Sequence, residues 1–278
     1  MHDADRSPPR LRRQAWIWPL AVPRRVARRA LDWGHRLADV AARRRTWIAW
    51  AATAGLAPIL VCYGLGLPAQ HLLAAALLAP LLLAAVARDN LRLGIGVLAV
   101  AFVAHNAATI ALAAYDPAGM AEIFPAGADY WERSRHWILT GEKPEYDVRW
   151  WLPEHGRLLC GVGVFTYTSL GFLTLWQGFY EVDLMNYYVG QLVVHSRSPW
   201  QALLLGWHPW SACRGLGYLL ITFEVASLSF SRLTGARLST AARRGKRWAA
   251  GLALLGLDVG IKYCCTDLVR AALYENLL

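Results

Sequence analysis

Polar and ionisable residues interrupt the apolar stretches between Asp183 and Arg232, and these residues are the best candidates for chemistry. They are Asn186, His195, His208, Arg214 and Glu224. Such groups are costly at membrane depth, so they are paired, line a cavity or serve the function of the protein. Glu224 is the strongest candidate because positions 220, 221 and 228 around it are apolar. It must reach another helix, where the potential partners are Lys262, Arg214, His195 and His105.

A second charged pair lies near the end of the chain. Asp258 and Lys262 are four residues apart, so they share one face of a helix and can neutralise each other. This spacing favours a structural ion pair. The alternative is an ion or proton path that also includes Glu224.

Other residues have the chemistry of metal or cofactor ligands. Glu132 and His136 are one helical turn apart, and Glu154 and His155 follow at the same predicted surface, so the four could bind a divalent metal or act as acid and base. Their spacing is not that of an HExxH motif, and ordinary surface interactions are favoured. Three histidines could ligate a tetrapyrrole, but no haem-attachment motif accompanies them and no cofactor is predicted: His105, His195 and His208. For His105 and the adjacent Asn106, a hydrogen bond to a neighbouring helix is favoured.

The composition identifies the environment of these residues. Of the 278 residues, 56% are hydrophobic, and they form long apolar runs, which indicates a membrane protein. The net charge of +10 is unevenly distributed: residues 1–45 carry twelve arginines against four acids, and residues 115–156 carry eight acids against four bases. Basic residues that flank apolar spans on one side are typical of the cytoplasmic side of a membrane. This pattern argues against nucleic-acid binding.

The apolar runs predict an all-α, polytopic transmembrane bundle of six to seven spans, one of them broken. A basic arm, 1–45, contains an amphipathic helix that contacts anionic lipid or a cytosolic partner. A three-span segment covers 46–114, an aromatic and partly helical cap covers 115–156, and a second transmembrane segment covers 157–278. The expected spans are 46–66, 71–87, 93–114, 157–180, 184–206, 211–230 and 248–273. The element 184–206 is expected to be the broken helix, because charged residues and Pro199 interrupt it.

The C-terminal half resembles the stage II sporulation protein M family of bacterial membrane proteins. The resemblance rests on Asn186 with Gly190, on His208-Pro209, and on Glu224-Val225-Ala226, in that order along the chain. It implies a membrane component without enzymatic activity that works with partners.

Three functions are compatible with the sequence. The leading hypothesis is a structural or accessory subunit of a larger assembly in the bacterial inner membrane, with the amino terminus in the cytoplasm and the carboxyl terminus in the periplasm. Its expected partners are the bilayer and other membrane proteins. The second is a permease or channel with a path near Glu224, Asp258 and Lys262. The third is a membrane enzyme that uses Glu132, His136, Glu154 and His155.

Overall fold

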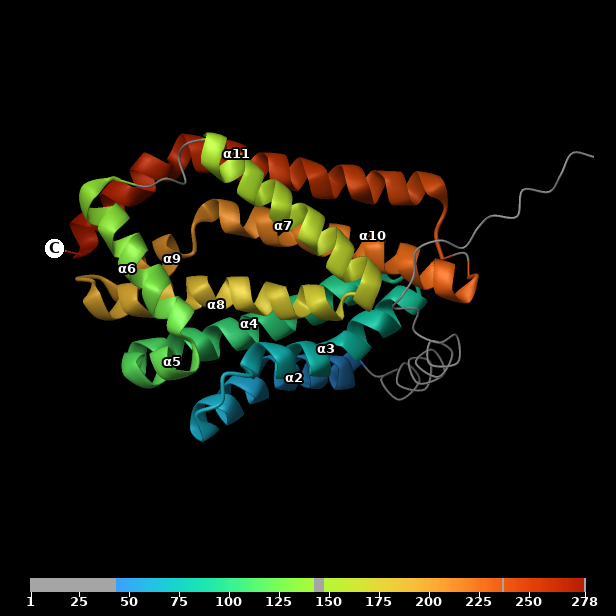
Figure 1. Ribbon diagram of the computed structural model, residues 1–278, viewed down its shortest axis with the longest axis horizontal. Coiled ribbons are helices and arrows are strands. Elements are labelled where there is room, and N and C mark those ends of the chain that lie inside the picture. The colour runs from blue at the N-terminus through green and yellow to red at the C-terminus, as the bar shows by residue number, and fades with distance from the viewer. Residues whose placement is uncertain (1–43, 143–147, 237, 278) are drawn as a thin grey trace, which may run out of the picture.

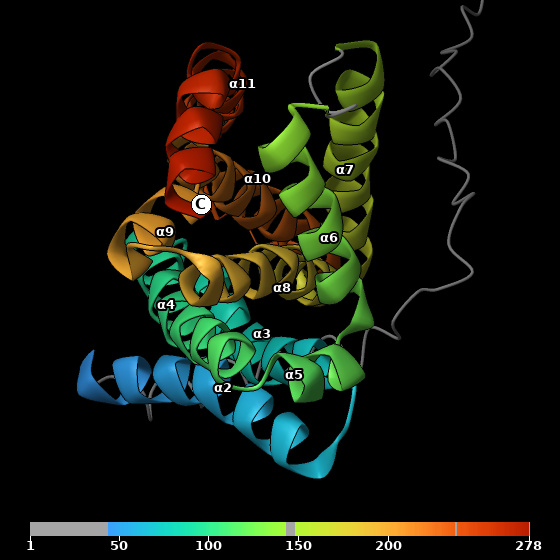
Figure 2. The same cartoon turned by 90° about the vertical axis from the view of Figure 1, so that its left-hand side faces the viewer.

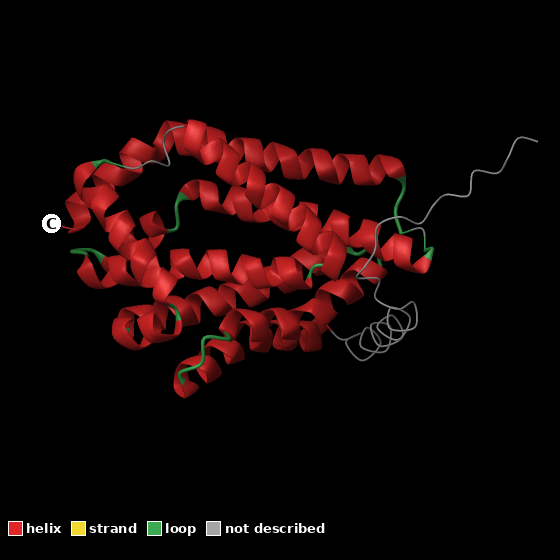
Figure 3. Cartoon of the chain, in the orientation of Figure 1, coloured by secondary structure: helices red, strands yellow, loops and turns green. Residues whose placement is uncertain are grey.

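The computed structural model describes residues 44–142, 148–236 and 238–277, and within these ranges helices joined by short loops, with no strands, make up the chain (Figures 1 and 3). The basic arm predicted over 1–45 lies almost wholly outside the described residues. The helices are α2 (Arg44–Leu65), α3 (Gln70–Ala87), α4 (Leu91–Tyr115), α5 (Pro117–Ile123), α6 (Pro125–Thr140), α7 (Val148–Ser169), α8 (Phe172–His195), α9 (Pro199–Gly206), α10 (Pro209–Thr234) and α11 (Ala241–Leu277).

Four helical stretches of the described chain are long and apolar enough to cross a membrane. They are Thr46–Leu65, Gln70–Ala87, Leu91–Tyr115 and Pro199–Thr234, the last of which spans α9 and α10. A hydrocarbon core about 30 Å thick needs roughly 20 apolar residues in a helix. The helices therefore indicate a membrane protein, as the sequence predicted, with four spans identified by length and hydropathy.

The predicted boundary between the fourth and fifth spans is wrong. The sequence suggested a span over 157–180 that ends just before Asp183, whereas the chain turns ten residues earlier, at Leu170 and Gly171. Both residues have positive φ, 56° and 96°, and so reverse the chain between α7 and α8. The hydroxyl of Ser169 accepts a hydrogen bond from the amide of Leu173 and supports the start of α8. Asp183 consequently lies in the middle of a 24-residue helix.

The predicted interruption within 184–206 lies between α8 and α9. Ser196 has an extended backbone, and Pro199 begins α9. The part before this break is the second half of α8, so it continues a helix that begins at Phe172 and does not begin at 184 as predicted.

The connections between the long helices gather at two ends of the bundle (Figure 1). One end, here called the basic end, holds the α3–α4, α7–α8 and α10–α11 connections. There Arg243 and Arg247 of α11 form ion pairs with Asp89, with N–O distances of 3.1 and 2.8 Å. The opposite end, here called the cap end, holds the α2–α3 and α8–α9 connections together with α5 and α6.

A hydrogen bond fastens the cap end to α2. The hydroxyl of Tyr63 donates to Oδ2 of Asp116 at 2.6 Å, and Asp116 also accepts a bond from the amide of Gly119. These two bonds, that from Tyr63 first, lower the pKa of Asp116 below its ordinary value. The carboxylate is thereby kept ionised at the start of α5.

Helix α8 occupies the centre of the bundle. Figure 2 shows it between the group formed by α2, α3 and α4 and the group formed by α10 and α11. It contacts α3, α4, α6 and α7 along its length. Side chains that project from α8 into the bundle can therefore meet residues that are far away in the sequence.

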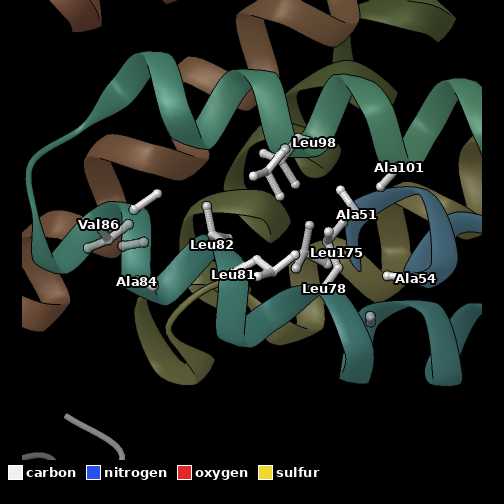
Figure 4. Packing of buried hydrophobic residues seen from close by; sticks show 14 of the residues in the cluster. Ala51, Ala54, Leu78, Leu81, Leu82, Ala84, Val86, Leu98, Ala101 and Leu175 are labelled. Atoms are coloured by element: carbon white, nitrogen blue, oxygen red, sulfur yellow. The ribbon is translucent and has the colours of Figure 1, made fainter. Parts of the chain in front are cut away.

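The half of the bundle nearer the basic end is filled by a core of mainly small and aliphatic side chains, here called the aliphatic core (Figure 4). It includes Ala51 and Ala54 of α2, Leu78 and Leu82 of α3, and Leu175 of α8. Helices α2 and α4 approach so closely that a Cβ atom on Gly55 would lie 2.1 Å from the carbonyl oxygen of Ala101. Small residues permit such close packing of membrane helices.

Candidate functional site: a buried aspartate between two histidines

Asp183 of α8 lies between two histidines from two other helices. Its Oδ1 is 2.8 Å from Nε2 of His105 on α4, and its Oδ2 is 2.9 Å from Nε2 of His71 on α3. The side chains of Asp183 and His105 have no exposed surface, and that of His71 is 8% exposed. Three helices thus bring three titratable groups together inside the bundle.

His105 has a second hydrogen-bond partner. Its Nδ1 lies 3.0 Å from the carbonyl oxygen of Gly55 on α2. The close approach of α2 to α4 makes this contact possible, because Gly55 has no side chain that would separate the two helices. A carbonyl oxygen can only accept, so Nδ1 of His105 carries a hydrogen.

Side-chain amides extend this histidine–aspartate cluster. The Nδ2 of Asn186 donates to Oδ1 of Asp183 at 3.0 Å and to Oδ1 of Asn106 at 3.1 Å. The Gln70 amide lies beside His71. Two buried amide oxygens, Oδ1 of Asn186 and Oε1 of Gln70, have no hydrogen-bond partner among the described residues.

Aromatic rings surround both histidines. Phe124 and Tyr180 meet the ring of His71 edge-on at centroid distances of 5.1 and 5.5 Å, and Phe179 meets that of His105 at 4.7 Å. Such an apolar shell lowers the local dielectric constant and strengthens the interactions of the charged groups within it. Phe124 connects α5 to α6, so the cluster lies under the cap end, and the aliphatic core separates it from the basic end.

No protein-family model, no curated protein and no solved structure matches this chain. The resemblance to the stage II sporulation protein M family therefore remains a hypothesis.

Glu224 is buried, as expected for an intramembrane acid, but its predicted partners are wrong. Its Oε1 accepts a hydrogen bond from Arg247 at 2.8 Å, and the same Arg247 nitrogen binds Asp89 at 2.8 Å. Arg247 lies between the predicted spans 211–230 and 248–273, whereas in the structure it lies one to two turns inside α11 and binds Glu224 of α10. Oε2 of Glu224 has no hydrogen-bond partner among the described residues.

Asp258, which the sequence predicted to pair with Lys262 on its own helix, forms an ion pair with a neighbouring helix. Nε of Arg214 on α10 lies 3.2 and 3.0 Å from the two carboxylate oxygens of Asp258 on α11. A single N–H group of the guanidinium is thus shared between both carboxylate oxygens. The pair joins the last two helices.

The remaining predicted polar residues lie elsewhere. His195 stacks on Trp131 and its Nδ1 contacts the carbonyl oxygen of Gln191, while His208 stacks on Trp210. Of the proposed intramembrane site, only Asn186 belongs to the histidine–aspartate cluster. Sequence reasoning assigned His105 and Asn106 a structural role and did not select His71 or Asp183.

Glu132 and His136, which were predicted to form a surface site on the cap, contact other residues. Glu132 lies 3.9 Å from Arg135, and His136 lies 3.5 Å from Glu142. The side chain of Glu154 lies outside the described residues, as does any contact it makes with His155. Among the described side chains, no group of three or more His, Cys, Asp or Glu residues could hold a metal ion.

Proposed function

We propose that the protein crosses the inner membrane seven times, with the basic end in the cytoplasm and the carboxyl terminus outside. Helices α7, α8 and α11, with 22, 24 and 37 residues, add three crossings to those of α2, α3, α4 and α10. All seven run between the basic and cap ends in Figure 1. The orientation is supported by the basic residues at one end, which are Arg88, Arg92, Arg232, Arg243, Arg244, Lys246 and Arg247.

We further propose that the protein is a proton-coupled permease that binds a proton at the histidine–aspartate cluster. The observation that carries this proposal is the fully buried Asp183 between His71 and His105. Histidine changes its charge near neutral pH, and a carboxylate beside it holds the proton in place. Chains of Asp and His inside membrane helices are typical of proton relays in pumps and transporters.

The closed packing of the cluster favours a proton over a larger reactant. Phe124, Phe179 and Tyr180 are in ring-to-ring contact with the histidines, so an enzyme substrate has no open face to approach. A proton needs no cavity, because it moves along hydrogen bonds. The closed packing therefore favours proton binding over an enzymatic reaction at this cluster.

A purely structural role explains the cluster less well. A buried ion pair is often no more stabilising than well-packed apolar residues in its place. Ionisable groups inside membrane helices are costly and are by default candidates for a functional site.

The proposal is tested by the charge displaced when proteoliposomes on a solid-supported membrane receive a rapid change of pH. Proton binding inside the membrane displaces charge even when the transported solute is unknown. We expect a signal from the natural protein and none from Asp183→Asn, because an amide does not take up the proton.

Asp258→Asn is the matched control, since it removes an equally buried acid from a different ion pair. It should retain the signal. A signal of equal size in Asp183→Asn, or none from the natural protein, contradicts the permease.

An accessory subunit is the second candidate, and an apolar groove on the surface favours it. The groove has a volume of about 530 Å³ and lies between α4, α8 and α9, lined by Ala107, Ile110, Ala111, Ala114, Val193, Pro199, Trp200, Leu203 and Trp207. Alanines allow a second helix to pack closely, and Trp200 is 76% exposed. We expect a subunit to co-purify with a stoichiometric membrane protein after mild extraction, and a protein that runs alone and colourless contradicts this candidate.

A further inference from the structure

The hydrogen bonds of the cluster determine how many protons it holds. Nδ1 of His105 must carry one, because it faces the carbonyl oxygen of Gly55. The contact between Nε2 of His105 and Asp183 then needs a second proton, since a bare ring nitrogen and a carboxylate oxygen repel each other. The contact between Nε2 of His71 and Asp183 needs a third.

This number can be compared with the ordinary content of the three groups. Two neutral histidines carry one ring proton each and a carboxylate carries none, which gives two protons and a net charge of −1. With three protons the cluster is electrically neutral, whether the additional proton resides on His105 or on Asp183. An unpaired charge is strongly disfavoured in so buried a site. The third proton, which the hydrogen bonds need, is therefore also the proton that makes the cluster electrically neutral.

We propose that the cluster binds three protons in its resting state, one more than its groups ordinarily carry, and that His71 exchanges them with the cap end. The ligand of this site is a proton, or equivalently a hydronium ion that delivers one. The inference deepens the proposed function and rests on it for its biological role, but the number of bound protons can be measured separately.

His71 is the group that exchanges protons with the solvent, because it is the only one of the three with exposed side-chain surface. Its side chain is 8% exposed, whereas those of His105 and Asp183 are not exposed at all. His71 is the second residue of α3, next to the α2–α3 connection at the cap end. On the opposite side, the aliphatic core separates the cluster from the basic end. A proton therefore has a short path from the cap end and no polar path through this core.

The described groups that face His71 come from three elements. From α8 come the titratable Asp183 and Tyr180, and from its own helix comes the amide of Gln70. The connection between α5 and α6 contributes the apolar ring of Phe124. His105 of α4 reaches His71 only through Asp183, so the protonation of one histidine is passed to the other through this carboxylate.

The number of protons is measured by ¹⁵N NMR of histidine-labelled protein in lipid bilayers at about pH 8, where a free histidine with a pKa of about 6.5 is neutral. We expect either one histidine with both ring nitrogens protonated, assigned by its loss in His105→Gln, or a protonated carboxyl band in the infrared spectrum, assigned by its loss in Asp183→Asn. If both histidines carry a single proton and Asp183 is ionised in the natural protein, the inference is overturned. This outcome needs no variant to fold.

The exchange role of His71 is measured by the rate at which the proton between His105 and Asp183 exchanges with deuterium. We expect His71→Gln to slow this exchange about 100-fold or more, because glutamine can donate a hydrogen bond to Asp183 but cannot relay a proton. His195→Gln is the matched control, since His195 is bonded to its own helix and should leave the rate unchanged. An unchanged rate in His71→Gln overturns the exchange role.

The two proposals can fail separately. Three bound protons together with an undiminished pH-jump signal in Asp183→Asn would retain the inference and remove the permease. Two bound protons together with loss of that signal in Asp183→Asn would support the permease and overturn the inference of a third proton.

Discussion

Asp183 illustrates the limit of sequence reasoning at the scale of single residues. Its partners His71 and His105 lie 112 and 78 positions away, so no local spacing reveals the group. The polar character of Asn186, His105 and Asn106 was visible in the sequence, but not that they meet. The one local signal is the apolar pattern that continues past Asp183, through Leu184, Tyr187 and Tyr188, which is typical of the interior of a helix.

The stability of the protein is expected to depend on Arg247, because it is the one described partner of the buried Glu224 and also binds Asp89. Arg247→Ala would leave the carboxylate of Glu224 buried without a counter-charge. We expect it to lower the free energy of unfolding by about 3–5 kcal/mol, measured by denaturation in detergent micelles.

The neighbouring Arg243 provides the control. It binds the same Asp89, but its side chain is 61% exposed, so Arg243→Ala should cost about 1 kcal/mol or less. Equal losses in the two variants would show that burial of Glu224 does not depend on Arg247.

At the scale of helices, the first half of the bundle could be predicted and the second half only in part. The apolar runs 46–66, 71–87 and 93–114 agree closely with α2, α3 and α4, because each has the length of a membrane span and ends at turn-forming or polar residues. Between α7 and α8 the polar and turn-forming residues are few and lie inside a long apolar run: after Ser169, Leu170 and Gly171 with positive φ reverse the chain. Because the turn lies ten residues earlier than predicted, Asp183 lies in the core and not in a loop between two spans.

The packing of α2 against α4 is a second feature of the site that the sequence does not reveal. The contact between His105 and Gly55 exists because α2 lies against α4 at that glycine, where a side chain would strike the carbonyl of Ala101. A glycine in an Ala-rich span predicts close packing of helices in general. It does not identify the neighbouring helix or the polar group that this neighbour brings.

For the whole molecule, the proposed arrangement with seven crossings requires that α8 crosses the membrane, although this helix carries Glu181 and Asp183 and is not among the stretches that hydropathy identifies as spans. Its 24 residues are about 36 Å long at 1.5 Å each, enough to cross a hydrocarbon core of about 30 Å. If α8 crosses, residues just before and just after it lie on opposite sides of the membrane.

Labelling with a membrane-impermeant maleimide measures this directly in a background without the five native cysteines. We expect Arg197→Cys, on the exposed α8–α9 connection, to react in intact cells, and Thr168→Cys, next to the α7–α8 turn, to react only after permeabilisation. Arg243→Cys at the basic end is the control and should behave like Thr168→Cys. Reaction of positions 168 and 197 from the same side would mean that α8 does not cross. Asp183 would then lie in a re-entrant element, where its proton would come from the side of entry alone and no transmembrane path would pass through it.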